Sequence, residues 1–378
     1  MIKTRLFTPG PTDVPAEVLL EMAKPMIHHR TPEFKEIFTA AHEGLKKVFC
    51  TEQDVIMMAG SGTAGMEAAI VSACPRGKKA LIVNSGKFGE RWVKVGKQFG
   101  LDVDEVVCPW GTTIDPELVR EKLATGEYGS VVVVYSETST ATACDLEKIA
   151  GIVRETEAIL ICDAITACGT LPLKTDEWGV DIVASGSQKA FMLPPGLAVL
   201  TVSDKAWKCV EANGDIPAFY LNLNPYRKAI AKNDTPYTGP VSLVRGMKIA
   251  CDMLNEVGIE KVWSRSAILA KATRAACAEL GLALRSESPS DSVTAIALPE
   301  GVDDSIRKVL KSKYGMAVAG GQDDWKGNTI RVSHMGYVDI FDTIGMIAAL
   351  EYALTDCGAK VEIGKGVAAA VQVLKDWE

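Results

Sequence analysis

The sequence predicts an α/β protein in which a mainly parallel sheet lies between layers of helices. Short apolar runs rich in Val and Ile recur, helix-like segments separate several of them, and polar or glycine-rich residues follow them directly. Strands that are buried on both faces have such unbroken apolar runs, and intervening helices connect parallel neighbours. The predicted strands are Ala80–Val83, Val131–Tyr135, Ala158–Cys162, Val180–Ala184 and Leu197–Val202.

The helix-like segments have apolar residues three and four positions apart, the spacing that places them on one helical face. The segment after a glycine-rich stretch carries Met66, Ala69, Ile70 and Ala73 on such a face, and Leu146–Val153 is a second block of this kind. Strands and helices therefore alternate through the middle of the chain, as they do in doubly wound α/β domains.

The pattern changes from about residue 245, where the long helical segments Val244–Val257 and Lys261–Leu280 begin. A second, smaller α/β unit follows from about residue 290. Its last helix, over Asp339–Leu354, carries an apolar stripe that we expect to pack in a core. The chain is thus predicted to have a large domain and a smaller C-terminal domain.

Composition indicates a globular protein of 378 residues, 47% hydrophobic and 24% charged, with a net charge of -7 and no long basic run. These values argue against nucleic acid as a partner. No apolar run reaches the roughly 18 residues of a membrane span, and the start MIKTRLFTPGPTDVP lacks the apolar core of a signal peptide. We therefore expect a cytoplasmic protein that does not associate with membranes.

Ten cysteines and four histidines raise the question of disulfides or a metal. The cysteines stand singly, with no C-x-x-C pair, and the histidines do not have a usual metal-ligand spacing. We expect the cysteines to be reduced, mostly buried residues, and we expect no metal site.

The glycine-rich stretch Gly60-Ser61-Gly62-Thr63-Ala64-Gly65 fits the pattern G-x-G-x-x-G, which is typical of a dinucleotide site. The same turn at a helix start binds any phosphate, because free N–H groups point out of the helix. A dinucleotide site also has an acidic residue about 20 positions further on, at the end of the next strand. Here that strand ends in Asn84-Ser85-Gly86. An NAD-dependent dehydrogenase therefore remains only as an outside alternative.

Two residues at strand ends point to a different cofactor. Lys189, in SGSQKAFMLPPG, is either a solvated lysine, as most lysines are, or a partly desolvated amine that can form a Schiff base. Asp163 directly follows a buried run, where it either caps the next segment or holds a pyridinium nitrogen in its protonated form. Together with a one-phosphate cradle at Ser61, Gly62 and Thr63, these residues suit pyridoxal 5'-phosphate.

The sequence resembles the class V, fold-type I pyridoxal-phosphate aminotransferases, and closely the alanine–glyoxylate / serine–pyruvate aminotransferase family. The resemblance covers nearly the whole chain. It is carried by TPGP at 8–11, GSGT at 60–63, SETST at 136–140, Asp163, GSQKA at 186–190 and IRVSHMG at 330–336. It implies a large domain, 17–258, with a mainly parallel seven-stranded sheet that binds the cofactor. It also implies a small domain made of 1–16 and 259–378.

The resemblance implies a role for each matching residue. Lys189 would carry the cofactor as a Schiff base and act as general acid and base, and Asp163 would pair with the ring nitrogen. Other residues implied to bind the cofactor are Ser61, Gly62 and Thr63 with Gln188 at the phosphate, Phe88 stacked on the ring, Thr138 near the phenolic oxygen, and Thr238, which would reach the neighbouring subunit of a homodimer. Gly10 would line the substrate pocket and Arg331 would bind the α-carboxylate. His28-His29-Arg30 stays without an assigned role.

The implied reaction moves an amino group from alanine or serine to a 2-oxo acid such as glyoxylate or pyruvate. Related enzymes that use ureidoglycine, aspartate or 2-aminoethylphosphonate remain alternatives. Cysteine desulfurases share the fold, but they carry a His beside the lysine, where this chain has Gln188. A non-catalytic accessory subunit is disfavoured because Lys189 and Asp163 are both retained.

Overall fold

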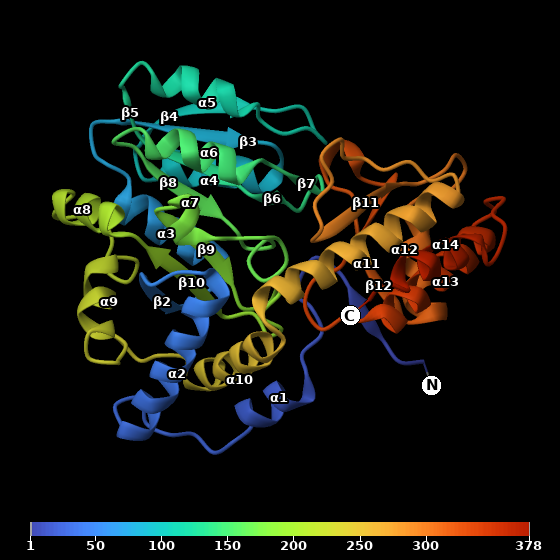
Figure 1. The fold of residues 1–378 in the computed structure, drawn as a ribbon, viewed down its shortest axis with the longest axis horizontal. Coiled ribbons are helices and arrows are strands. Elements are labelled where there is room, and N and C mark those ends of the chain that lie inside the picture. The colour runs from blue at the N-terminus through green and yellow to red at the C-terminus, as the bar shows by residue number, and fades with distance from the viewer. Residues whose placement is uncertain (1, 378) are drawn as a thin grey trace.

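The computed structural model describes residues 2–377, which fold around two main sheets (Figure 1). The larger sheet has the seven strands β2 (Asp54–Ala59), β10 (Leu197–Val202), β9 (Ile182–Gly186), β8 (Ile159–Asp163), β5 (Tyr128–Val134), β3 (Lys79–Asn84) and β4 (Asp102–Val107), in that spatial order. Neighbours pair in parallel except at β10, which is antiparallel to both β2 and β9. The prediction of a mainly parallel sheet is confirmed.

All five predicted strands are present, and β10 has the predicted limits Leu197–Val202. Two strands of this sheet are not among those five: β2, whose apolar run leads into the glycine-rich stretch, and β4, with the sequence DVDEVV. Strand β4 lies at an edge of the sheet and its residues are half-buried or exposed. An edge strand tolerates charged residues, so it lacks the apolar run that marks its buried neighbours.

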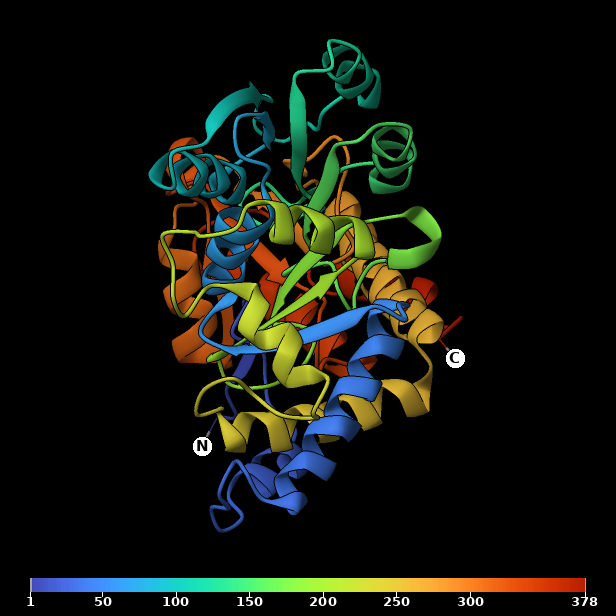
Figure 2. The ribbon, with the colours of Figure 1, turned by 90° about the vertical axis from the view of Figure 1, so that its left-hand side faces the viewer.

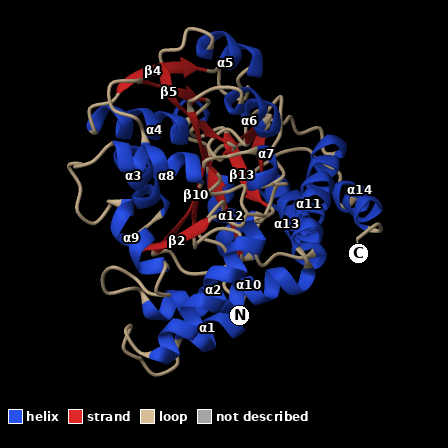
Figure 3. Ribbon diagram, turned by 60° about the vertical axis from the view of Figure 1, so that its left-hand side comes forward, coloured by secondary structure: helices blue, strands red, loops and turns tan. Residues whose placement is uncertain are grey.

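Helices cover both faces of this sheet, because successive side chains of its strands point to opposite sides. Val131 and Val133 of β5 pack with α2 (Pro32–Phe49), α5 (Pro116–Leu123), α6 (Leu146–Arg154) and α10 (Val241–Val257). Val132 and Val134 pack with α3 (Gly62–Ala73), α4 (Lys87–Gln98), α8 (Asp204–Ala212) and α9 (Leu223–Ile230). Figure 3 shows the two groups of helices on either side of the strands, and Figure 2 shows α2 and α10 beneath them.

The smaller sheet has the order β1 (Arg5–Phe7), β12 (Met316–Gly320), β13 (Thr329–Ser333), β11 (Val293–Ala297). The N-terminal strand β1 thus pairs with β12, in parallel, more than three hundred positions along the chain. Its helices are α11 (Ile259–Glu279), α12 (Ser305–Tyr314), α13 (Ile340–Asp356) and α14 (Lys365–Leu374). Gly258 alone separates α10 from α11. We therefore propose the domain limits 17–258, and 1–16 with 259–378.

The remaining elements are short: α1 (Ala16–Met22), α7 (Thr175–Trp178), the 3-10 helix η1 (Asp323–Trp325) and the hairpin β6 (Ser136–Glu137) with β7 (Thr142–Ala143). On α13 the predicted stripe packs as expected, because Ile347, Leu350 and Leu354 are buried. All ten cysteines are free, and six of them are buried. No helix within residues 2–377 is both long enough and apolar enough to cross a membrane.

Candidate active site

The predicted site residues gather at the carboxyl edge of the large sheet. Gly60–Thr63 follows β2, Asn84–Phe88 follows β3, and Ser136–Thr140 follows β5. Asp163 ends β8, and Lys189 stands three residues after the end of β9. Because these five strands run in the same direction, their ends meet along one edge, which is where open α/β sheets bind ligands.

Lys189 is buried at this edge under the N-terminal segment. Its side chain is 8% exposed, and its amine donates a hydrogen bond to the carbonyl oxygen of Pro9. Gly10 has a φ of +108, and a Cβ at this position would overlap the Lys189 amine. Thr12 fixes the segment by donating from Oγ1 to the Lys189 carbonyl at 2.9 Å. The structure thus places Gly10 directly beside Lys189.

Burial gives Lys189 unusual chemistry. Loss of water around the amine lowers the pKa of Lys189 to about 8, against the opposing charge of Asp163. Arg331 and Arg91 lower this pKa further. A lysine with this pKa has a far larger neutral fraction near physiological pH than an ordinary lysine, and the neutral amine is the form that attacks an aldehyde.

Asp163 is a buried carboxylate, 3% exposed, with an N–H donor at each oxygen. The backbone N–H of Ile165 donates to Oδ1 at 3.0 Å, and the indole N–H of Trp92 donates to Oδ2 at 2.8 Å. Burial raises the pKa of Asp163 to about 6, and the two donors oppose that rise. The carboxylate is therefore largely ionised at neutral pH and can face a cation.

The predicted phosphate cradle fits an anion. Helix α3 begins at Gly62, and the side chain of its N-cap, Ser61, makes no capping hydrogen bond. The carboxamide oxygen of Gln188 is buried without a partner among the described residues, but an oxygen only accepts, so the NH2 group of this side chain is what could donate to an anion. A Cβ on Gly62 would lie 2.5 Å from the terminal methyl group of Ile165, so a larger residue would require this side chain to move. Free N–H groups at a helix start bind phosphate.

Phe88 is held in place by Glu137, a residue that the sequence analysis did not single out. Glu137 is fully buried, and its carboxylate accepts from the backbone N–H groups of Phe88 at 3.1 Å and Gly89 at 3.0 Å. It therefore caps the first turn of α4, where a negative charge is stabilised. The sequence contained a signal that could have identified Glu137, because this residue lies inside the SETST motif.

Arg331 reaches the same site from the small domain. Its guanidinium donates from Nη1 to the carbonyl oxygen of Thr138 at 2.7 Å and from Nε to that of Gly320 at 2.9 Å. The Thr138 hydroxyl lies 3.1 Å from that of Thr166. Burial lowers the pKa of Arg331 to about 10, so the side chain stays charged. Strand β13 thus brings a cation to the residues that follow β5.

Thr238 is not brought to the cradle by its own chain: it is exposed, and no hydrogen bond within residues 2–377 links it to Ser61–Thr63. Arg30 holds the loop before it, donating from Nη1 to Asp234 Oδ1 at 2.7 Å and to the Thr235 carbonyl at 2.5 Å. The structure therefore gives one residue of His28-His29-Arg30 a role in ordering this loop.

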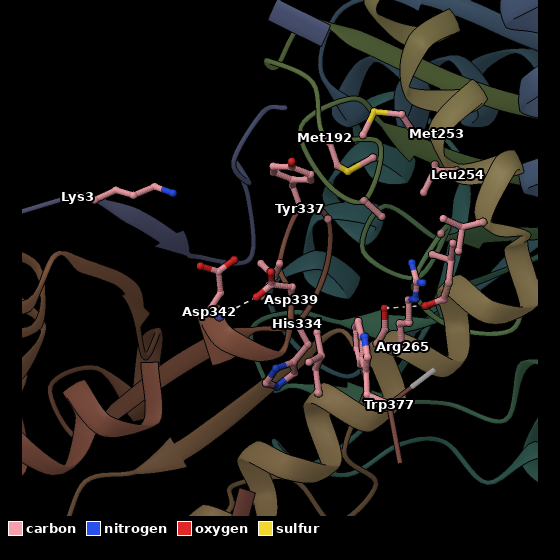
Figure 4. Close-up of a pocket in the computed structure, with 18 residues that line it drawn as sticks. Lys3, Met192, Met253, Leu254, Arg265, His334, Tyr337, Asp339, Asp342 and Trp377 are labelled. Atoms are coloured by element: carbon pink, nitrogen blue, oxygen red, sulfur yellow. Dashed lines mark hydrogen bonds between the residues drawn. The ribbon is translucent and has the colours of Figure 1, made fainter. Parts of the chain in front are cut away.

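A separate cavity of about 440 Å³ lies between the domains (Figure 4). Met192, Met253, Tyr337, Arg265 and Trp377 are among the residues around it. None of the predicted catalytic, cofactor-binding or substrate-binding residues lines it. Within the described part of the chain, no group of three or more His, Cys, Asp or Glu side chains is placed to bind a metal ion.

Comparison with known proteins agrees with this site. Residues 5–356 match the family described as Aminotransferase class-V. A protein of Anabaena cylindrica named "Soluble hydrogenase 42 kDa subunit" is 40% identical over 99% of both chains. The L-aspartate–glyoxylate aminotransferase of Paracoccus denitrificans is 35% identical over 97% of this chain and 94% of its own. The serine–glyoxylate aminotransferase of Methylorubrum extorquens is 36% identical, over 99% and 96%.

Solved structures are also similar over their whole length. The alanine–glyoxylate aminotransferase of Nostoc sp. superposes with a TM-score of 0.88 at 29% identity, covering 94% of this chain and 96% of that chain. The ureidoglycine–glyoxylate aminotransferase of Bacillus subtilis superposes with a TM-score of 0.92 at 27% identity, covering 98% of both. The overall architecture is that of the fold-type I enzymes, as the sequence predicted.

Fold and site together define an enzyme that transfers amino groups with pyridoxal 5'-phosphate as its cofactor. The chain belongs to the class V aminotransferase family. The alternative of an NAD-dependent dehydrogenase is thereby set aside. The relatives named above differ in their amino donors, so the substrates have to be argued from the site itself.

Proposed function

We propose that this transaminase moves the amino group of a small amino acid, alanine or serine, to a small 2-oxo acid, glyoxylate or pyruvate. The observation that carries the proposal is the tight cover over Lys189. The Pro9 carbonyl accepts a hydrogen bond from the amine, and a Cβ on Gly10 would overlap the end of the Lys189 side chain. A pocket closed this near to the reacting amine favours donors with short side chains.

Within this proposal, the Lys189 amine would hold the cofactor covalently at its aldehyde carbon. Once freed by the incoming substrate amine, Lys189 would accept the proton from the substrate Cα and deliver it to that cofactor carbon. Its lowered pKa suits both directions of that transfer. The bound cofactor supplies an electron sink, and the Asp163 carboxylate stabilises the positive ring nitrogen on which that property depends.

The other residues of the site would hold and orient the cofactor and the substrate. Ser61, Gly62, Thr63 and Gln188 would bind the phosphate, Phe88 would stack on the ring, and Thr138 would lie near the phenolic oxygen. The uncapped start of α3 supports the phosphate contacts, and the anchoring of α4 by Glu137 supports the position of Phe88. Arg331 binds the substrate α-carboxylate, because two of its donors are bound to backbone carbonyls and no hydrogen bond within residues 2–377 uses Nη2. A guanidinium fixed in this way presents its free edge to a planar anion.

A donor panel tests this proposal. Alanine, serine, aspartate, ureidoglycine and 2-aminoethylphosphonate are compared by kcat/KM, each against glyoxylate, and all except alanine also against pyruvate, because alanine and pyruvate would only regenerate each other. We expect alanine or serine to give the highest values. Arg331→Lys should lower kcat/KM for these donors about 100-fold, because bidentate binding of the carboxylate is lost. 2-Aminoethylphosphonate, which lacks the α-carboxylate, is the control and should change much less. A higher kcat/KM for aspartate, ureidoglycine or 2-aminoethylphosphonate would contradict the proposed donor.

We also propose a homodimer in which Thr238 completes the phosphate cradle of the neighbouring subunit. Two observations support it: Thr238 is exposed on a loop that Arg30 holds in place, and Phe219 beside that loop is 80% exposed. Phe219 stands 5.5 Å from Tyr237 between ring centroids, so the exposed surface is aromatic and continuous with the loop. Exposed apolar surface of this kind marks an interaction site.

Mixed dimers test this arrangement. Lys189→Ala removes the reacting amine, and Thr238→Glu places a negative charge against the phosphate. Each homodimer should be inactive. In a purified mixed dimer with one chain of each kind, one of the two sites has both wild-type residues, so about half of the wild-type activity returns if Thr238 acts across the interface. An inactive mixed dimer would show that Thr238 serves its own subunit, and a monomer in sedimentation would refute the dimer.

A further inference from the structure

Trp92 is a fully buried residue of α4 that makes a direct contact with the cofactor site. Its side chain is 0% exposed, and its Nε1 lies 2.8 Å from Asp163 Oδ2. The sequence analysis did not single it out, because the two residues are 71 positions apart. Trp92 stands four positions after Phe88, one helical turn, so the same helix carries both side chains to the site.

The hydrogen bond matters because Asp163 has few other partners. Its carboxylate forms no ion pair among the described residues, and its only hydrogen bonds come from Trp92 and the Ile165 backbone. The charged groups that face it are Lys189, which lowers its pKa, and Glu137, which raises it. A buried carboxylate with two donors loses a large share of its stabilisation when one donor is removed.

The geometry also restricts how the carboxylate can turn. Trp92 binds Oδ2, while the Ile165 N–H binds Oδ1, so the two donors fix the plane of the group from opposite ends. The indole ring is itself immobile, since it packs in the core formed by α3, α4, α8 and α9 against the sheet. A planar donor held by packing fixes the orientation of its acceptor better than a flexible side chain does.

We propose that Trp92 is a positioning residue of this transaminase: its indole N–H holds the Asp163 carboxylate in one orientation and keeps it ionised for the ring nitrogen of the cofactor. The proposal rests on the proposed role of Asp163. It gives Trp92 no contact with substrate, so its effect should appear in the properties of the bound cofactor.

The test compares Trp92→Phe with Trp207→Phe as a matched control. Trp207 is 2% exposed and belongs to the same core, but its Nε1 has no hydrogen-bond partner among the described residues. Both changes remove an indole and retain an aromatic ring. Two quantities are measured: the dissociation constant of pyridoxal phosphate, and the pH midpoint of its visible absorbance on the protein.

We expect Trp92→Phe to weaken cofactor binding about tenfold or more, as loss of a hydrogen bond to a charged group does. We also expect the absorbance midpoint to rise, because a ring nitrogen without its proton withdraws less charge from the rest of the cofactor. Trp207→Phe should leave the dissociation constant within about twofold of wild type and the pH midpoint unchanged within measurement error. In an Asp163→Asn background, Trp92→Phe should no longer move the midpoint, since the residue acts through Asp163.

Equal values for the two tryptophan variants, or a full effect of Trp92→Phe in the Asp163→Asn background, would overturn the proposal. If Trp92→Phe does not fold, Trp92→Met replaces it, because the flexible methionine side chain adapts to the space without supplying a donor. Failure of the proposed function looks different: wild-type protein would then take up no pyridoxal phosphate. In that case the pH dependence of thermal unfolding, compared between Trp92→Phe and Trp207→Phe, still tests the bond to Asp163.

Discussion

Lys189→Ala is expected to abolish transamination, with a loss of about 10⁴-fold or more, because in the proposed mechanism one amine both binds the cofactor and moves the proton. Borohydride should fix the cofactor to wild-type protein at the peptide that contains Lys189, as read by mass spectrometry, and should fix nothing to the variant. Lys174→Ala is the control, because Lys174 is half-buried at the surface and, among the described residues, pairs only with Glu177. Full activity in Lys189→Ala would refute the assignment.

The lowered pKa of Lys189 adds a pH dependence to the same prediction. Burial sets this pKa at about 8, below the ordinary value of 10.5. The neutral amine is the reactive form, so the rate of pyridoxal phosphate uptake by cofactor-free protein should rise with pH, reach half of its maximum near pH 8 and level off above about pH 9. An exposed lysine would let the rate rise past pH 10, and stopped-flow absorbance distinguishes the two curves.

The sequence predicted those parts of the fold in which local pattern and burial agree. Strands β5, β8 and β10 are buried along their whole length, so their apolar runs stand out. The edge strand β4 was not predicted, because its charged, solvent-facing residues interrupt the apolar run. The position of the site could be predicted from one rule, that open α/β sheets bind ligands at the carboxyl ends of their strands. Strands that run in the same direction bring Gly60–Thr63, Asp163 and Lys189 to one edge, whatever the sequence between them.

The contacts between distant segments could not be predicted in the same way. Three contacts of this kind join residues that are far apart in sequence: Trp92 with Asp163, Arg30 with Thr235, and Arg331 with Thr138. In each pair, one of the bonded atoms is a backbone carbonyl oxygen or an indole nitrogen, which a sequence motif does not identify. Such contacts depend on the packing of whole helices and loops. Only the structure shows that the Pro9 carbonyl covers the Lys189 amine, and this cover now carries the argument for small substrates.

Asp163→Asn is expected to lower kcat about 1,000-fold or more, because a neutral amide cannot stabilise the positive ring nitrogen and the catalytic effect of a buried charge is worth several kcal/mol. The variant should still carry pyridoxal phosphate on Lys189, so borohydride fixation persists while turnover is lost. This combination separates Asp163 from Lys189, whose replacement removes both. If the variant retained more than about a tenth of wild-type kcat, the loss would be no larger than that of an ordinary surface substitution. That result would contradict the role of Asp163.

The same variant has a second effect, on the stability of the cofactor-free chain. The pKa of Asp163 is about 6 in the folded chain, above its value of about 3.9 in an unfolded chain. The folded chain therefore binds the proton more tightly, so the stabilisation is complete below about pH 4 and is lost as the pH rises through 6. Between pH 4 and 7.5 the free energy of unfolding should fall about 2 kcal/mol more in wild type than in Asp163→Asn. Denaturant unfolding at several pH values measures this difference, and parallel pH profiles for the two proteins would show that burial does not perturb this carboxyl group.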